Sequence, residues 1–235
     1  MSVDDVSEAW EANAGQWLAW ARSPSHDLWF HELNLPEFAK LLPAAGRRTL
    51  DVGCGEGRVG RWLAGPGHRL SGIDSSPTLA AAAIEAGGYE EVICGDALAL
   101  PWPADTFDLA IAFMSLQDMP DPGGAIAEIA RVLEPGGILC IAIVHPLNRP
   151  ESHFADYFSE HRCSESVTRD GLTMTFETVD RPLETYTRAL SDAGFVITDL
   201  REPRPTPETL ERSPALAAAA LQPFLLHLRC RLSEL

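Results

Sequence analysis

One glycine-rich segment constrains the fold of this chain most strongly: Leu50-Asp51-Val52-Gly53-Cys54-Gly55-Glu56-Gly57. It begins with apolar residues, as a buried strand does, and residues 58–63 behind it can continue as a helix. Glycine has no Cβ, so a ligand can approach the backbone of such a turn closely. A helix that starts behind the turn points free N–H groups at the same ligand. The segment therefore predicts a strand, a ligand-binding turn and a helix in succession.

The spacing of the glycines separates two kinds of ligand. A dinucleotide fingerprint, G-x-G-x-x-G, would have its third glycine at the position of Arg58, whereas here the glycine falls at Gly57. Asp51 adds a negative charge two residues before Gly53. A carboxylate attracts a cationic ligand group and repels a pyrophosphate. The pattern disfavours a nicotinamide oxidoreductase, and NADH binding would restore that alternative.

Apolar strand patterns alternate with helical patterns from about residue 48 onward. Candidate strands are Thr49–Val52, Arg69–Ile73, Glu91–Cys94, Phe107–Phe113, Gly137–Val144, Phe195–Leu200 and Pro223–Arg231, and candidate helices are Gly57–Ala64, Pro77–Ala86, Gly124–Leu133 and Pro182–Ala193. This alternation predicts an α/β protein with a Rossmann-like, doubly wound and mostly parallel sheet that carries helices on both faces.

Two segments lie outside the alternation. We expect residues 1–45 to form a helical cap or lid, in which Trp10, Trp17 and Trp20 share one helix face. Residues 46–235 would form the ligand-binding domain, with an insertion at about 146–180 that is irregular except for one strand, Leu172–Thr178.

The composition narrows the range of partners. The formal net charge is -16 and Lys40 is the only lysine, which disfavours nucleic acid as a partner. No apolar run approaches the roughly 18 residues of a membrane helix, and Met1-Ser2-Val3-Asp4-Asp5 does not resemble a signal peptide. We therefore expect a cytoplasmic protein that acts without a membrane. The odd count of five cysteines without a C-x-x-C pair predicts no metal site, with Cys54, Cys94 and Cys140 as buried thiols.

Four further motifs follow the glycine turn in order. Asp74-Ser75 ends the second strand, about twenty residues on, where an acid can accept ribose hydroxyls. Asp96-Ala97 ends the third strand. Leu100-Pro101-Trp102-Pro103-Ala104-Asp105-Thr106-Phe107-Asp108-Leu109-Ala110 leads into the fourth, and Arg131-Val132-Leu133-Glu134-Pro135-Gly136-Gly137 precedes the fifth. One such feature could merely shape a turn, whereas the ordered series indicates a ligand site.

Together these motifs resemble the small-molecule branch of the class I S-adenosylmethionine (SAM) methyltransferases, which includes ubiquinone- and menaquinone-pathway enzymes. The resemblance covers about residues 50–144 and departs from the family pattern at Ala104, where the family has an acid that here follows at Asp105. It implies SN2 transfer of a methyl group from SAM to O, N or C of a small molecule, with S-adenosylhomocysteine as product. It also implies an antiparallel last strand.

The resemblance assigns cofactor contacts by position. Asp51, Gly53, Cys54, Gly55 and Gly57 would surround the methionine part of SAM. The rest of the cofactor would be held by Asp74 and Ser75 at the ribose, Asp96 and Ala97 at the adenine, and Phe113 and Met114 at the sulfonium. Arg58 is interpreted as a helix-surface residue.

Catalytic and substrate residues are less well determined by the pattern. His145, which ends the fifth strand, is the first candidate for a base or orienting group, followed by Asp118 and Gln117. Many relatives carry a His-His or similar pair where this chain has Gln117-Asp118, so the roles of these two residues stay open. Substrate contacts are expected from Trp17, Trp20, His26, His153 and Tyr157, although tryptophans at helical spacing also suit a core.

Three alternatives remain open at this point. A SAM-binding enzyme could catalyse another reaction, such as a cyclisation or the synthesis of a modified SAM, because a fold does not determine a function. A non-catalytic SAM sensor would bind SAM without turnover. The sequence also leaves open whether the protein forms a homodimer.

Overall fold

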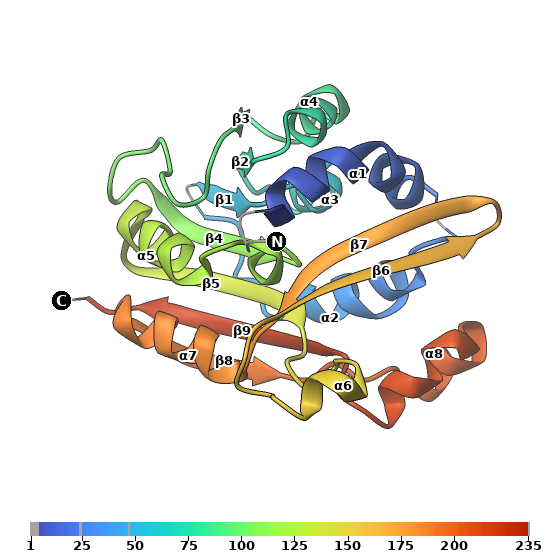
Figure 1. Ribbon diagram of the computed structural model, residues 1–235. Helices are drawn as coiled ribbons and strands as arrows, with labels where there is room; N and C mark the ends of the chain where they lie inside the picture. The colour runs from blue at the N-terminus through green and yellow to red at the C-terminus, as the bar shows by residue number, and fades with distance from the viewer. Residues whose placement is uncertain (1–4, 24, 47, 235) are drawn as a thin grey trace.

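The computed structural model describes residues 5–23, 25–46 and 48–234 (Figure 1). Its strands are β1 (Thr49–Val52), β2 (Leu70–Asp74), β3 (Glu91–Cys94), β4 (Phe107–Phe113), β5 (Leu133–Val144), β6 (His161–Arg169), β7 (Leu172–Asp180), β8 (Phe195–Arg201) and β9 (Leu225–Leu232). The α-helices are α1 (Asp5–Ala21), α2 (Leu35–Ala39), α3 (Arg58–Ala64), α4 (Pro77–Ala86), α5 (Pro122–Val132), α6 (Glu151–Phe154), α7 (Leu183–Asp192) and α8 (Pro207–Arg212). Shorter helical turns are η1 (Phe30–Asn34, a π-helix), η2 (Leu116–Asp118) and η3 (Pro214–Ala220).

Seven strands form one sheet in the order β3-β2-β1-β4-β5-β9-β8. The pairs from β3 to β5 are parallel, and β9 is antiparallel to both of its neighbours. The strand order therefore reverses between β1 and β4. In open α/β sheets, ligands bind outside the carboxyl ends of the strands at such a switch point.

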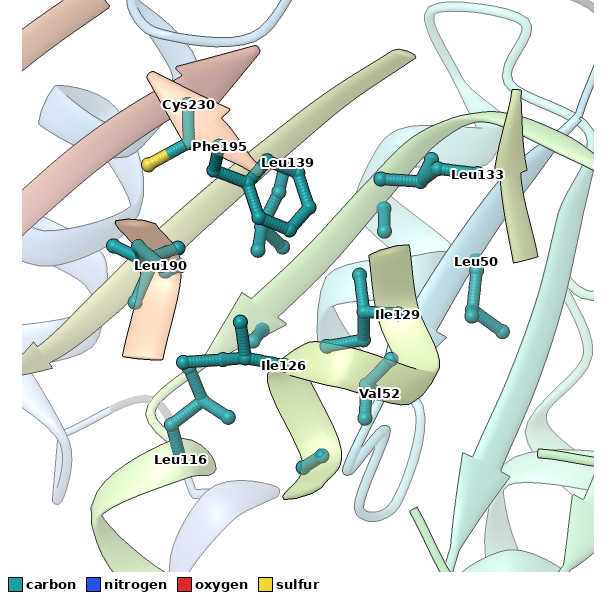
Figure 2. Packing of buried hydrophobic residues seen from close by; sticks show 14 of the residues in the cluster. Leu50, Val52, Leu116, Ile126, Ile129, Leu133, Leu139, Leu190, Phe195 and Cys230 are labelled. Atoms are coloured by element: carbon teal, nitrogen blue, oxygen red, sulfur yellow. The ribbon is translucent and has the colours of Figure 1, made fainter. Parts of the chain in front are cut away.

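Helices cover both faces of the sheet because β4 alternates its side chains between two cores. Ala110 and Ala112 face a cluster completed by α5 and α7, part of which is shown in Figure 2. Leu109 and Ile111 face a second cluster with α2 and α3. This period of two is the pattern of a strand buried on both sides. The predicted Rossmann-like fold and its antiparallel last strand are confirmed.

The predicted strands lie within a few residues of the observed ones, and two differences have clear causes. β5 begins at Leu133, before the predicted Gly137, because Leu133 already pairs with Phe107 ahead of a register shift. The strand β6 was missed because its sequence, HRCSESVTR, has no apolar face. β6 and β7 pair as an antiparallel hairpin that lies along α1 (Figure 1).

Two further expectations concern the burial of the cysteines and the presence of a membrane-spanning helix. Cys54 and Cys140 are buried, as expected, but Cys94 is exposed at the end of an edge strand. Within the described ranges no helix has the length and apolarity needed to cross a membrane. The signal-peptide argument rested mostly on residues 1–4, which lie outside the described residues.

Candidate active site

A cavity of about 700 Å³ opens at the carboxyl ends of the parallel strands. Most of the residues predicted for the site line it: Trp17, Trp20, His26, Asp51, Gly53, Cys54, Gly55, Asp74, Ser75, Asp96, Ala97, Phe113, Met114, Gln117 and Asp118. The four predicted residues outside its lining are Gly57, His145, His153 and Tyr157. One continuous space therefore joins the strand ends to the segments that cover them.

The glycine turn forms part of the cavity floor. Gly53 has φ +72°, and a Cβ there would overlap the side chain of Ser115. Gly55 has φ +57°, and a Cβ there would find only Trp17, with Nε1 at 3.7 Å. Because both residues adopt positive φ and line the cavity, they keep the backbone within reach of a ligand.

Gly57 has a different role from the one that the sequence predicted. It precedes α3 with φ +84°, and a Cβ would lie 3.2 Å from Ala83 and from the Tyr89 ring. This glycine faces α4 instead of the cavity. It permits close packing between the loop and its neighbours.

Asp74 connects the glycine turn to the start of α4. Its Oδ2 accepts the Gly55 N–H at 2.7 Å, and its Oδ1 accepts the Ser76 N–H at 2.9 Å. Burial raises the pKa of Asp74, and the two backbone donors oppose that rise. Each carboxylate oxygen can accept more than one hydrogen bond, so Asp74 retains acceptor capacity for ligand hydroxyls.

Asp51 lies deeper in the floor and is 1% exposed. The Tyr89 hydroxyl donates to its Oδ2 at 2.6 Å. Burial raises the pKa of Asp51 to about 7, with an opposing contribution from the Tyr89 hydrogen bond and a further rise from the charge of Asp74. Its charge therefore changes near neutral pH.

The loops after β3 and β4 complete the floor. Asp96 is exposed and accepts the Leu98 N–H at 2.9 Å, which fixes the loop where Ala97 borders the cavity. Met114 has φ +55°, an uncommon value for a residue with a side chain. The Met114 N–H donates to the Ala142 carbonyl at 2.7 Å, and this bond holds the turn against β5.

Gln117 and Asp118 bring polar groups to the wall beside β4. Gln117 is 5% exposed and its Oε1 has no hydrogen-bond partner, while its Nε2 lies 3.3 Å from Asp118 Oδ2. Burial raises the pKa of Asp118 well above its usual range, against hydrogen bonds from Thr178 and Gln117 and the charge of Arg181. An acceptor without a hydrogen-bond partner thus lies beside a carboxyl group whose pKa is raised.

Arg181 holds this wall in place. Its guanidinium is fully buried and donates to the backbone carbonyls of Gln117 at 3.1 Å and Met119 at 2.9 Å. It also forms an ion pair with Glu160. These contacts join segments more than 60 residues apart, so no local sequence pattern reveals them.

His145 is not placed as the sequence predicted. Its Nδ1 accepts the Leu147 N–H at 3.0 Å and its Nε2 lies 3.2 Å from Glu202 Oε1. Burial is the main effect on its pKa, which is lowered. Both ring nitrogens are engaged outside the cavity lining, so the geometry argues against a base at this position.

His153 and Tyr157 also lie outside the cavity lining, contrary to the substrate-contact prediction. His153 Nδ1 lies 2.6 Å from Asp180 Oδ2, and its ring stacks on His161. The Tyr157 hydroxyl accepts the Leu183 N–H at 2.9 Å. These side chains secure the insertion to α7 and to the base of the hairpin.

The cavity roof is built from α1 and the β6–β7 hairpin. Trp10 Nε1 donates to the Glu177 carbonyl at 3.0 Å, and Gln16 Oε1 accepts the Thr175 N–H at 3.0 Å. Below the helix, Glu11 accepts from the Thr78 hydroxyl at 2.6 Å and from Ser76. One helix therefore bonds both to the hairpin and to the start of α4.

Aromatic rings fill the inner side of the roof. Trp17 and Trp20 each meet Phe176 edge to face, with ring centroids 6.3 and 6.1 Å apart. His26 lines the cavity, but its Nε2 bonds the Arg169 carbonyl at 3.0 Å and its Nδ1 faces Ser23. This histidine serves to join the cap to the hairpin.

Arg58 is not the helix-surface residue that the sequence suggested. Its guanidinium lies 4.6 Å from the Trp17 ring centroid and 3.8 Å from that of Phe30, and it pairs with Asp27 at 2.6 Å. It lines the cavity with only 14% of its side chain exposed. The same residue that breaks the dinucleotide fingerprint therefore fixes the cap above the glycine turn.

No group of three or more His, Cys, Asp or Glu in the described ranges is arranged to hold a metal ion. Tyr89, Glu11 and Glu177 were not predicted from the sequence. Tyr89 and Glu11 bond to segments 38 and 67 positions away, and Glu177 accepts a bond from Ser164 across the β6–β7 hairpin. The glycines that surround the Tyr89 ring, Gly57, Gly60 and Gly72, come from other segments of the sequence and give no local signal.

The chain resembles known methyltransferases in sequence. Residues 50–141 match the methyltransferase domain family. The chain is 33% identical to a ubiquinone biosynthesis O-methyltransferase of Ralstonia nicotianae over 129 residues, 52% of each protein. It is 38% identical to the methyltransferase GfsG of Streptomyces halstedii over 112 residues, 45% of this chain and 40% of that protein. The chain spans about half the length of the curated relatives it matches.

Solved structures agree with this result. A SAM-dependent methyltransferase from Mesorhizobium loti superposes with a TM-score of 0.66 and 25% identity, over 83% of this chain and 96% of that one. The [4+2]-cyclase SpnF shares the fold with a TM-score of 0.66 at 22% identity, over 99% and 96% of the two chains. Residues 50–141 thus form a methyltransferase domain, and the proteins that the chain resembles in sequence and in fold include SAM-dependent methyltransferases.

Proposed function

We propose that this chain transfers the methyl group of SAM to a hydroxyl or amine of a small organic molecule. The observation that carries the proposal is the single cavity that runs from Gly53, Gly55 and Asp74 to Gln117 and Asp118. A cofactor on the floor and an acceptor under the roof would share one enclosed space. Such an arrangement aligns two reactants and excludes water.

The floor supports SAM in the orientation that the family motifs imply. Gly53, Cys54 and Gly55 would hold the methionine part beside Asp51, and Asp74 would accept hydrogen bonds from the ribose. Ser75, Asp96 and Ala97 would border the adenosine, and Phe113 and Met114 the sulfonium. All of these residues line the cavity, and Gly57 is left out because it packs against α4.

Asp118 is our candidate for the base. When bound, SAM supplies a methyl group on a cationic sulfur, and its transfer to an O–H or N–H nucleophile releases one proton. Asp118 can accept that proton, because a carboxylate whose pKa is raised by burial binds a proton more strongly. Gln117 Oε1 has no hydrogen-bond partner in the protein, so it can accept a hydrogen bond from the molecule that is methylated.

The substrate side favours an uncharged or cationic molecule over an acid. Each arginine in the lining is engaged by the protein itself: Arg58 by Asp27, Arg149 by three backbone carbonyls, and Arg169 by the carbonyls of Ser25 and His26. The aromatic lining suits a flat apolar body. The net charge of -16 supports a small molecule over nucleic acid.

We further propose that residues 1–45 and the insertion at about 146–180 act together as the lid of a domain formed by 46–235. The bonds between α1 and β7 support this division. A cytoplasmic location and homodimer formation stay predictions from the sequence.

Product mass distinguishes this function from its alternatives. The protein would be incubated with SAM and a panel of phenols, alcohols and amines, with matched carboxylic acids as controls. Methyl transfer predicts a gain of one CH₂ on a hydroxyl or amine together with release of S-adenosylhomocysteine. A product rearranged without added mass would support a cyclase, and SAM binding without any product across the panel would support a sensor.

A further inference from the structure

Tyr89 fills a space formed by three glycines beneath the cofactor turn. It lies in the loop between α4 and β3, and a Cβ on Gly60 would overlap its ring. A Cβ on Gly72 would lie 3.0 Å from the ring, and one on Gly57 would lie 3.2 Å from it. A side chain at Gly60 would displace the ring and one at Gly57 or Gly72 would crowd it, so glycines of the turn, of α3 and of β2 together make room for Tyr89.

The ring delivers its hydroxyl to the buried carboxylate of the cavity floor. The Tyr89 hydroxyl donates to Asp51 Oδ2 at 2.6 Å. Burial raises the pKa of Tyr89 well above its usual range, so the phenol keeps its proton and acts as a donor. Asp51 lines the cavity next to Gly53 and Gly55, where the amino-acid end of SAM would lie.

We propose that Tyr89 is a positioning residue for the cofactor: its hydroxyl orients the Asp51 carboxylate and stabilises the negative charge that pairs with the ammonium group of SAM. The inference rests on the proposed cofactor site and adds a residue that no motif contains. Tyr89 would act through Asp51, without touching the ligand.

The charged neighbours of Asp51 set the expected pH dependence. Burial and the negative charge of Asp74 raise the pKa of Asp51, the Tyr89 hydrogen bond lowers it, and the outcome is about 7. Beside it, burial raises the pKa of the Cys54 thiol well above its usual range, so Cys54 stays neutral. Removing the Tyr89 hydroxyl would therefore raise the pKa of Asp51 and leave less of it ionised at neutral pH.

The test is Tyr89→Phe, which keeps the ring between the glycines and removes only the hydroxyl. Affinity would be measured by calorimetry between about pH 6 and about pH 8.5 for S-adenosylhomocysteine and for 5′-methylthioadenosine, which lacks the ammonium group. For S-adenosylhomocysteine we expect a loss of roughly tenfold at the acidic end that shrinks to less than about twofold at the basic end. The affinity for 5′-methylthioadenosine should not change.

Two further measurements isolate the carboxylate. In the ligand-free protein, the carboxyl ¹³C resonance of Asp51 should titrate at higher pH in Tyr89→Phe than in the wild type. In an Asp51→Asn background, Tyr89→Phe should have no further effect on S-adenosylhomocysteine. Tyr157→Phe, which removes a hydroxyl outside the cavity lining, is the matched control and should leave both affinities unchanged.

An equal, pH-independent loss for both ligands in Tyr89→Phe would overturn the inference and leave the proposed cofactor site intact, because it would show a packing role alone. An unchanged affinity for S-adenosylhomocysteine at every pH would overturn it as well. If the wild type bound neither ligand, the proposed function itself would fail.

Discussion

The floor and the roof of the cavity are held together in different ways. In the floor, the turns after adjacent parallel strands bond backbone to backbone, as when the Gly53 N–H donates to the Ile73 carbonyl at 2.8 Å. In the roof, α1 meets the hairpin through side chains such as Trp10, which bonds a residue 167 positions away. A floor built this way is fixed by the sheet, whereas the roof depends on contacts that can open. We therefore expect cofactor affinity to depend mostly on the floor.

The largest effect is expected for Gly55→Val. The new side chain would enter the open space below Trp17 and adopt a φ of +57°, so SAM binding should fall by at least about a hundredfold. Calorimetry measures the loss. Gly67→Val is the matched control, because Gly67 also has positive φ, meets nothing within 4 Å and lies outside the cavity lining. If both variants kept SAM affinity, the cofactor would lie elsewhere.

Asp118→Asn should separate catalysis from cofactor binding. Loss of the base should lower the methyl-transfer rate by about 10²-fold or more on an acceptor found in the panel, with little change in SAM affinity. In the wild type, activity should fall as pH drops through the raised pKa of Asp118, since a base must be ionised to accept a proton. An unchanged pH–rate profile in Asp118→Asn would remove this residue from proton transfer.

Asp74→Ala tests the floor at a second position. Loss of charge-assisted hydrogen bonds to the ribose should weaken SAM by about 1–3 kcal/mol. The melting temperature should also fall, because the N–H groups of Gly55 and Ser76 lose their acceptor. Calorimetry and thermal unfolding measure the two effects, and an unchanged affinity would place the ribose away from Asp74.

The smallest effect on the cofactor is expected in the roof. Trp10→Phe removes the hydrogen bond to Glu177 but keeps an aromatic ring, so the free energy of unfolding should fall by about 0.5–1.5 kcal/mol. SAM affinity should change by less than about threefold, while limited proteolysis should cut the hairpin faster. If Trp10→Phe lost as much SAM affinity as Asp74→Ala, cofactor affinity would depend on the roof as much as on the floor, contrary to our expectation.

The same distinction explains what could be predicted from the sequence. Asp51, Gly53, Gly55 and Asp74 lie at strand ends, and a parallel sheet brings such ends together whatever the details of packing. Asp118 was predicted for the same reason, because it follows the end of the fourth strand. His145 also ends a strand, but its neighbours Leu147 and Glu202 engage both ring nitrogens, and this local geometry has no pattern in the sequence.

The sequence indicated a cap over the site, but the contacts that hold the roof together could not be predicted because their signals are long-range. β6 is polar on both faces, so its strand is recognised only once it pairs with β7. Arg58 was interpreted as a surface residue because the rings that enclose it, Trp17 and Phe30, come from the cap. Gly57 matched the motif, but its space is taken by Tyr89 and α4, which no spacing rule reveals.

Calorimetry of S-adenosylhomocysteine and NADH on the purified protein tests the central claim most directly. The account predicts one-to-one binding of S-adenosylhomocysteine, which Gly55→Val abolishes, and no binding of NADH. Binding of NADH in preference to S-adenosylhomocysteine would contradict the account, because it would show that the glycine turn accepts a pyrophosphate despite Asp51 and Arg58.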